Sequence, residues 1–104
     1  MNIEFFYLYR DAGNFKQFGS VVFANDKHLS IESITQAIKN SLIDELFFDP
    51  YAANVPPLFF DDFDDELDHD WHEFEVVKEV ETPTNDSLNR DITSFISQLS
   101  SLPK

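Results

Sequence analysis

Residues 61–75 hold the side chains of this chain that are best suited to bind a metal ion or transfer a proton. The stretch reads DDFDDELDHDWHEFE, with six aspartates, three glutamates and two histidines around the only tryptophan. Imidazole and carboxylate groups together suit zinc, iron or manganese, whereas carboxylates alone suit calcium or magnesium. The alternative is that the stretch is only the solvated rim of an acidic protein, and the spacing of its residues bears on the choice.

A metal site in this stretch would use His69 and His72, with Glu66 three residues before His69. Residues three apart in an extended chain point to opposite faces, so the two imidazoles converge only if 66–72 form a helical turn. The Glu66-x-x-His69 pair is half of a di-iron motif that needs a second copy and four helices, and a calcium loop needs a central glycine. We predict no cofactor and keep a small metal-dependent protein using Glu66, His69 and His72 as the alternative. Otherwise we expect His72 to be a core-side histidine with a hydrogen-bond partner.

Sequence signals for catalysis are missing. The only glycines are Gly13 and Gly19, so there is no phosphate-binding loop, dinucleotide fingerprint or nucleophile elbow. The chain has no cysteine, which excludes thiol nucleophiles and disulfides and fits a reducing cytoplasm. Two acids could flank a substrate in a hydrolase, but a sequence does not reveal the distance between carboxylates. We therefore expect a protein that is not an enzyme.

The charge of the chain is concentrated in one window. The net charge is −13, and residues 61–81 carry eleven of the twenty acids with Lys78 as the only base. Such a field repels nucleic acid and anionic lipid, and it attracts cations or a basic protein. Alternate residues along a strand lie about 6.6 Å apart, while phosphates of one DNA strand repeat about every 3.4 Å. Imitation of nucleic acid is thus possible but less favoured than an ordinary protein interface.

These features predict a surface that recognises a basic protein. Trp71 lies among the acids, and in interfaces a central aromatic residue supplies affinity while exposed carboxylates steer the partner. We therefore expect an acidic interaction module, of inhibitor or immunity type, with Trp71 as its anchor. The acids predicted to form its steering rim are Asp61, Asp62, Asp64, Asp65, Asp68, Glu73 and Glu75.

A small α+β domain is predicted to position these residues. With 104 residues, 42% of them hydrophobic, and twelve phenylalanines, the chain can form one domain over 1–104 with a real core. Alternating and helical spacings of apolar residues define the elements. We predict strands at 3–10, 15–24, 58–60 and 72–81, and helices at 31–43 and 87–101, the second capped by Asn85 or Asp86.

The predicted order of elements is ββαββα, which indicates a mainly antiparallel sheet with two helices packed on one face. Along 72–81, residues 72, 74, 76 and 80 are predicted to face the core, with the glutamates on the other side. The last residues, about 101–104, are expected to fray. No apolar run approaches the length of a membrane span, and the N-terminus lacks the pattern of a signal peptide. We expect a soluble cytoplasmic protein.

Three stretches resemble a family of small acidic bacterial proteins: IEFFYLYRDAGNFKQFGSVVF, SLIDELFF and LDHDWHEFE. The resemblance covers roughly residues 1–75 and is most specific in the N-terminal hairpin and in residues 69–75. The family has an Asp-Gly-Glu pattern in the middle stretch, whereas here Asp44 and Glu45 are adjacent. The resemblance implies a bacterial chain that stands alone as a domain. It implies no activity, cofactor or site residue.

Overall fold

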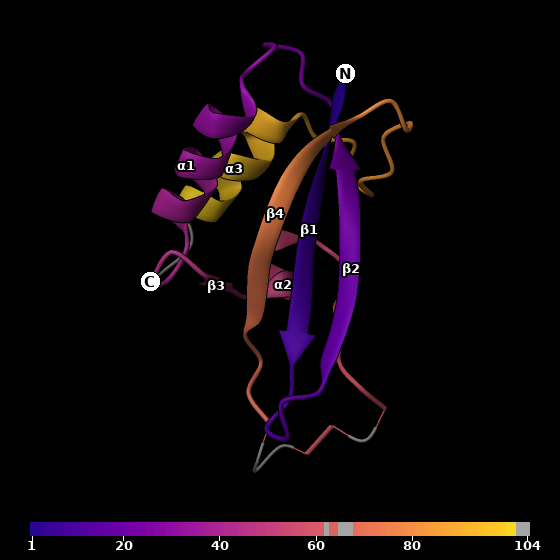
Figure 1. The fold of residues 1–104 in the computed structure, drawn as a ribbon, viewed down its shortest axis with the longest axis vertical. Helices are drawn as coiled ribbons and strands as arrows, with labels where there is room; N and C mark the ends of the chain where they lie inside the picture. Colours follow the sequence, from indigo (N-terminus) through magenta and orange to yellow (C-terminus); the bar gives the residue numbers. More distant parts are fainter. Residues whose placement is uncertain (62, 65–67, 102–104) are drawn as a thin grey trace.

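The α+β class predicted from the sequence is confirmed, with the same number of strands and one additional helix. The computed structural model describes residues 1–61, 63–64 and 68–101, and their antiparallel sheet has the strand order β2-β1-β4-β3 (Figure 1). The elements are β1 (Asn2–Arg10), β2 (Lys16–Phe23), α1 (Ile31–Ser41), β3 (Phe47–Phe48), α2 (Pro50–Ala53), β4 (His72–Val80) and α3 (Ile92–Ser101).

The predicted order ββαββα is wrong, because the observed order is ββαβαβα. Residues 58–60 form no strand, and the fourth strand is instead Phe47–Phe48, which pairs with the start of β4. The backbone of Leu58 bonds to side chains: its N–H donates to His72 and its carbonyl accepts from Gln17. Residues 58–60 therefore cross one face of the sheet and do not add a strand to it.

The core lies between one face of the sheet, here called the inner face, and the helices α1 and α3. Phe5 is at its centre, with ring centroids 4.9 Å from Phe95 and 5.5 Å from Phe74. Helix α1 contributes the buried residues Ile34 and Ile38 to the same cluster. This helical spacing of apolar residues is why both amphipathic helices pack on the inner face (Figure 1). No described helix covers the opposite, outer face.

A β-bulge at Glu75 changes the face that β4 presents to the core. Tyr7 pairs with Phe74 and Phe6 with Val76, so Glu75 has no partner on β1. The predicted alternation is therefore correct only as far as Phe74. Beyond the bulge, Val77 is buried in the core and Val76 is 36% exposed on the outer face.

Helix α3 begins five residues later than predicted. Its first residue is Ile92 rather than residue 87, and the carboxylate of Asp91 accepts from the N–H of Thr93, as an N-cap does. Neither Asn85 nor Asp86 caps the helix. The side chain of Asn85 accepts from the N–H of Val22 at the edge of β2, and Asp86 pairs with Arg90. The two polar residues thus join the loop to its neighbours.

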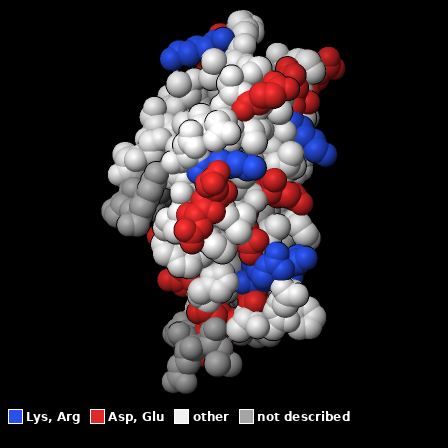
Figure 2. Space-filling view, turned by 60° about the vertical axis from the view of Figure 1, so that its left-hand side comes forward, with Lys and Arg blue, Asp and Glu red and all other residues white. Residues whose placement is uncertain are grey.

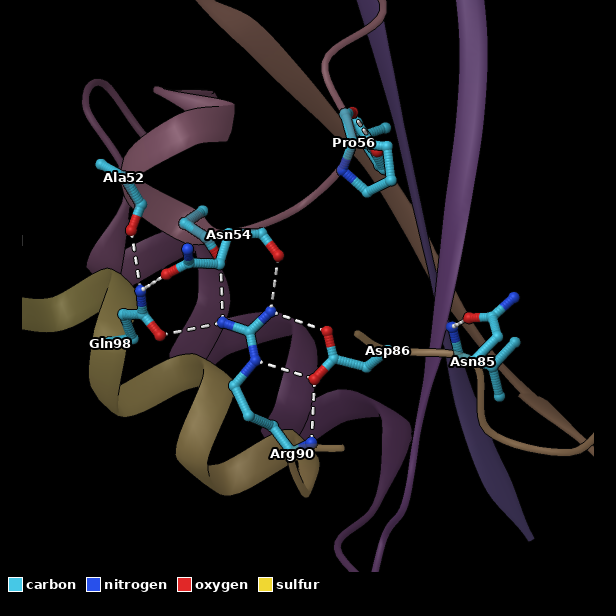
Figure 3. Close-up of polar contacts among 10 residues, drawn as sticks. Ala52, Asn54, Pro56, Asn85, Asp86, Arg90 and Gln98 are labelled. Carbon is cyan, nitrogen blue, oxygen red and sulfur yellow. Dashed lines mark hydrogen bonds and ion pairs between the residues drawn. The ribbon is translucent and has the colours of Figure 1, made fainter. Parts of the chain in front are cut away.

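Arg90 joins the loop before α3 to the end of α2 and to α3 itself (Figure 3). Its guanidinium donates to both oxygens of Asp86, to the carbonyls of Ala53 and Asn54 at the end of α2, and to the side chain of Gln98 on α3. The group also lies over the rings of Phe23 and Phe95, at 5.5 and 5.1 Å from their centroids. Burial alone would raise the pKa of Asp86, but the hydrogen bonds from Arg90 hold it below its usual value.

Breaking this buried pair should be costly. Asp86→Ala leaves a buried guanidinium without its counter-charge, so we expect the free energy of unfolding to fall by about 3–5 kcal/mol. Asp86→Ala/Arg90→Met should lose clearly less than the two single variants combined, because no charge is then left unpaired. Urea unfolding of the four proteins measures the coupling. Strictly additive losses would show that the two side chains do not act as a pair.

The turn at 44–45 allows a second test. Asp44 and Glu45 have φ of 52° and 59°, in the left-handed region, and they join Ile43 to Phe47 in a small hairpin. Because glycine adopts this conformation without strain, Glu45→Gly should raise the free energy of unfolding by about 0.5–1 kcal/mol. Gln36→Gly, in the middle of α1, should lower it by about 1 kcal/mol. Denaturant titration compares both with the wild type, and a similar loss in both variants would contradict the expected relief of strain.

Candidate functional site

Residues 61–75 are here called the acidic segment, or acidic end, of the molecule. Asp68 fixes it to the turn between β1 and β2, at the lower end of the sheet in Figure 1. One of its carboxylate oxygens accepts from the N–H of Ala12 and the other from the N–H of Asp64, each at 2.9 Å. These two backbone hydrogen bonds lower the pKa of Asp68. Asp68 was predicted as part of the steering rim, and the structure shows that its carboxylate also has this local structural role.

His72 is completely buried at the start of β4. Its Nε2 accepts from the N–H of Leu58 at 2.9 Å, so the proton of the neutral ring is on Nδ1, which lies 3.2 Å from the carbonyl oxygen of Asp70. Burial lowers the pKa of His72, and the Asp70 carbonyl opposes that shift. Both ring nitrogens are therefore used inside the protein, as expected for a core-side histidine.

His69 and His72 do not present a joint metal site. His69 is exposed, and its Nδ1 accepts from the N–H of Trp71 at 3.1 Å, whereas the ring of His72 is turned into the core. Across residues 1–61, 63–64 and 68–101, no three His, Asp or Glu side chains are grouped so that they could hold an ion. Glu66, the third predicted ligand, lies outside the described residues.

Glu73 is bound to Arg10 on the outer face of the sheet. The Arg10 guanidinium donates to its two oxygens at 2.9 and 3.3 Å, and Glu73 is only 8% exposed. The partner of Arg10 is therefore an acid on the neighbouring strand β4. Because its carboxylate is already occupied, Glu73 is the least available of the described acids predicted for the rim.

Trp71 remains 42% exposed at the start of β4. Asp61, Asp70 and Glu75 are also exposed, and none of them makes an ion pair with another described residue. Asp64 is exposed as well, with its N–H bound to Asp68. Two further acids predicted for the rim, Asp62 and Asp65, lie outside the described residues.

An aromatic cluster beneath the acidic segment was not predicted from the sequence. Phe59 lies at its centre, with ring centroids 4.9 Å from Tyr9, 4.9 Å from Phe63, 5.1 Å from His72 and 6.1 Å from Tyr51. Tyr51 is mostly exposed on α2, so the cluster reaches the surface. Burial and the nearby aspartates raise the pKa of Tyr9 to about 12. The signal was present in the run LFF at 58–60, which we interpreted as a strand.

Charge is distributed differently from the simple concentration in the sequence. Figure 2 shows Asp and Glu spread along the length of one side of the molecule, with separate Lys and Arg groups between them. Lys78, the only base of the 61–81 window, lies over the ring of Phe6 at 5.4 Å and forms no ion pair with a described residue. Lys78 therefore does not neutralise the exposed Asp61, Asp70 or Glu75 by an ion pair.

Comparison with protein-family models, with curated proteins and with solved structures finds no match to this chain. In the part of the chain that the structure describes, no helix is long and apolar enough to cross a membrane. The function of the acidic end therefore has to be inferred from its own geometry.

The buried neutral state of His72 predicts a pH dependence of stability. Its pKa in the folded state lies below the unfolded value of about 6.5, so in the interval between them the unfolded chain binds a proton that the folded chain does not. The free energy of unfolding should thus fall as the pH drops below about 6.5, with a slope of up to about 1.4 kcal/mol per pH unit.

Urea unfolding between pH 5 and pH 8 tests this expectation. His72→Phe keeps a ring among the aromatic neighbours but does not titrate, so its slope below about pH 6.5 should be smaller than that of the wild type. Equal slopes in the wild type and His72→Phe would contradict the assignment.

Proposed function

We propose that the protein is a non-enzymatic, acidic interaction module of inhibitor or immunity type that binds a basic protein partner in a bacterial cytoplasm. The observation that carries this proposal is the exposed ring of Trp71 next to the exposed Asp70, in the same acidic stretch as the exposed Asp61 and Glu75. None of these three acids makes an ion pair with another described residue. A large aromatic ring next to unneutralised carboxylates offers a partner both contact area and an attractive field.

Rigid attachment of the acidic end supports the proposal. Asp68 binds it to the Ala12 turn, and the hydroxyl of Tyr9 donates to the carbonyl of His69 at 2.8 Å. His72 anchors the next position in the core. A surface that is already ordered loses less conformational entropy on binding, which favours affinity for a protein partner.

The acids have unequal parts in this proposed surface. Glu73 and Asp68 hold the structure together through Arg10 and the Ala12 turn, so they contribute field more than direct contact. Asp61, Asp70 and Glu75 are exposed and are the better candidates for steering a basic partner. The same field disfavours nucleic acid and anionic lipid as direct ligands.

A matched pair of variants tests the role of the acidic end. The test variant is Asp61→Asn/Asp70→Asn/Glu75→Gln, and the control is Asp26→Asn/Asp44→Asn/Glu32→Gln, with exposed positions outside the window and the same change in net charge. Partners are captured on the wild type from a bacterial lysate, and association is then measured by surface plasmon resonance at several salt concentrations. We expect the test variant to associate about 10-fold more slowly at low salt, with a flatter salt dependence, and the control to change little.

Trp71→Ala separates anchoring from steering. Removal of a central aromatic typically costs about 2 kcal/mol or more of binding free energy, which is roughly a 30-fold faster dissociation at a nearly unchanged association rate. The same binding experiment supplies both rates. Captured partners that are not basic, or equal association rates for the test and control variants, would refute the proposed function.

A further inference from the structure

Strand β2 is an edge of the sheet with free backbone groups. Figure 1 shows β2 at the border, with no described strand beyond it. The N–H and carbonyl of Val22 both bond to Asn85, so Val22 directs its backbone groups away from β1. Because this direction alternates along an antiparallel strand, Lys16, Phe18 and Ser20 also direct theirs outward. No described residue pairs with the outward groups of these three residues.

The free part of the edge is short and defined at both ends. Asn85 occupies the backbone groups of Val22, and Phe15 is bonded to Asp11 within the β1–β2 turn. Only residues 16–20 can therefore accept an added strand. An antiparallel copy of the same segment can use all three outward residues on both sides in only one register, with Phe18 opposite Phe18 and Lys16 opposite Ser20.

We propose that the protein pairs with a second copy of itself through the β2 edge, in this register, to form a continuous eight-stranded sheet. Each of the three opposed pairs exchanges two backbone hydrogen bonds, as the hydrogen-bonded residue pairs of an antiparallel ladder do. The two-fold axis passes beside Phe18, and a self-complementary contact of this kind closes without leaving a second free edge at the junction.

Side chains on the outer face fit the paired register. Phe18 is 58% exposed, and its neighbour on β1 is Leu8, so two opposed Phe18 rings would lie on an apolar floor. Lys16 would lie opposite Ser20 of the second copy, whose hydroxyl donates to Glu4 at 2.6 Å. The register therefore brings the only charged residue of β2 toward a carboxylate and opposes no like charges.

Side chains on the inner face fit as well. In the same register Gln17 of one copy is opposite Gly19 of the other, so the larger side chain meets a position without one. Gly19 is closely covered by Leu58 of its own chain, since an added Cβ would come within 2.8 Å of a Leu58 methyl group. The amide of Gln17 already donates to the Leu58 carbonyl, so it points away from the proposed junction.

The β2 edge is also where self-repulsion is weakest. The chain has a net charge of −13, yet residues 12–25 contain no acid. A junction of five residues is smaller than a standard interface of about 1,600 Å², so the dimer should dissociate on dilution. Salt should strengthen it by screening the remaining repulsion. The inference does not rest on the proposed function. The two are distinguished by salt, because binding of a basic partner should weaken as salt is added, whereas the dimer should become stronger.

Sedimentation equilibrium of the wild-type chain gives the first test, from about 10 μM to about 1 mM in about 1 M NaCl, where the Debye length is about 3 Å. We expect the mass to rise with concentration from 12.1 kDa toward twice that value. Phe18→Asp places two carboxylates together at the axis and should weaken the dimer at least 10-fold. Val76→Asp, on the outer face but two strands from the β2 edge, should leave it unchanged. Monomers throughout this range, or a dimer lost in Val76→Asp, would overturn the proposal.

Disulfide trapping tests the register, and the absence of native cysteines makes it unambiguous. Opposed residues of a hydrogen-bonded pair have Cα atoms about 5.5 Å apart, within the range of a disulfide. Phe18→Cys should therefore form a covalent dimer under copper–phenanthroline oxidation. Lys16→Cys alone should not, whereas Lys16→Cys mixed with Ser20→Cys should. Failure of Phe18→Cys to cross-link faster than Lys16→Cys would refute the register.

Discussion

The hydrogen bonds of Arg90 determine where much of the remaining chain can lie. By binding the carbonyls of Ala53 and Asn54, this guanidinium fixes the point at which the chain leaves α2. From there the chain runs beneath the sheet, where the hydroxyl of Tyr7 donates to the Pro56 carbonyl and Leu58 reaches His72. One buried cation, just before the start of α3, thus sets the path of the segment that follows α2, which has no regular secondary structure. Its counter-charge, Asp86, is needed because an unpaired buried charge would be costly.

The acids of this chain divide into two groups with different physical roles. Asp68, Glu73 and Asp91 accept hydrogen bonds that connect segments distant in the sequence, and Asp86 neutralises the buried Arg90. The exposed carboxylates of Asp61, Asp70 and Glu75 form no ion pair with a described residue, and mutual repulsion of such charges costs stability. The acids that accept these hydrogen bonds stabilise the folded chain despite its net charge. The exposed, unpaired acids do not contribute to the stability of the fold.

The sequence predicted those features that depend on local periodicity. The β1–β2 hairpin, the apolar stripes of α1 and α3 and the burial of His72 all follow from spacings of two or of three to four residues. The errors have a different origin, because they depend on partners far along the chain. Phe47–Phe48 became a strand only because β4 offers an edge there, and Leu58 left the sheet because His72 and Gln17 bond to its backbone.

For the candidate site, too, the sequence predicted the local features but not the contacts between distant residues. Alternation placed Trp71 and Glu73 away from the core, which is correct, but it could not show that Arg10 would occupy the Glu73 carboxylate. The register between β1 and β4 decides that contact. The Tyr51–Phe59 stack depends on the path that Arg90 imposes, so no local pattern in the sequence could have indicated it.

The bulge at Glu75 has a consequence for the evolution of this strand. Phe74 and Val76 already pair with neighbouring residues of β1, so a chain lacking Glu75 would keep every sheet partner and every core residue in place. Glu75 is thus a separable insertion, which the fold accommodates by bending and twisting β4. Related chains could gain or lose this one residue without repacking the interior. Such a change would alter only the curvature of the sheet and one exposed negative charge.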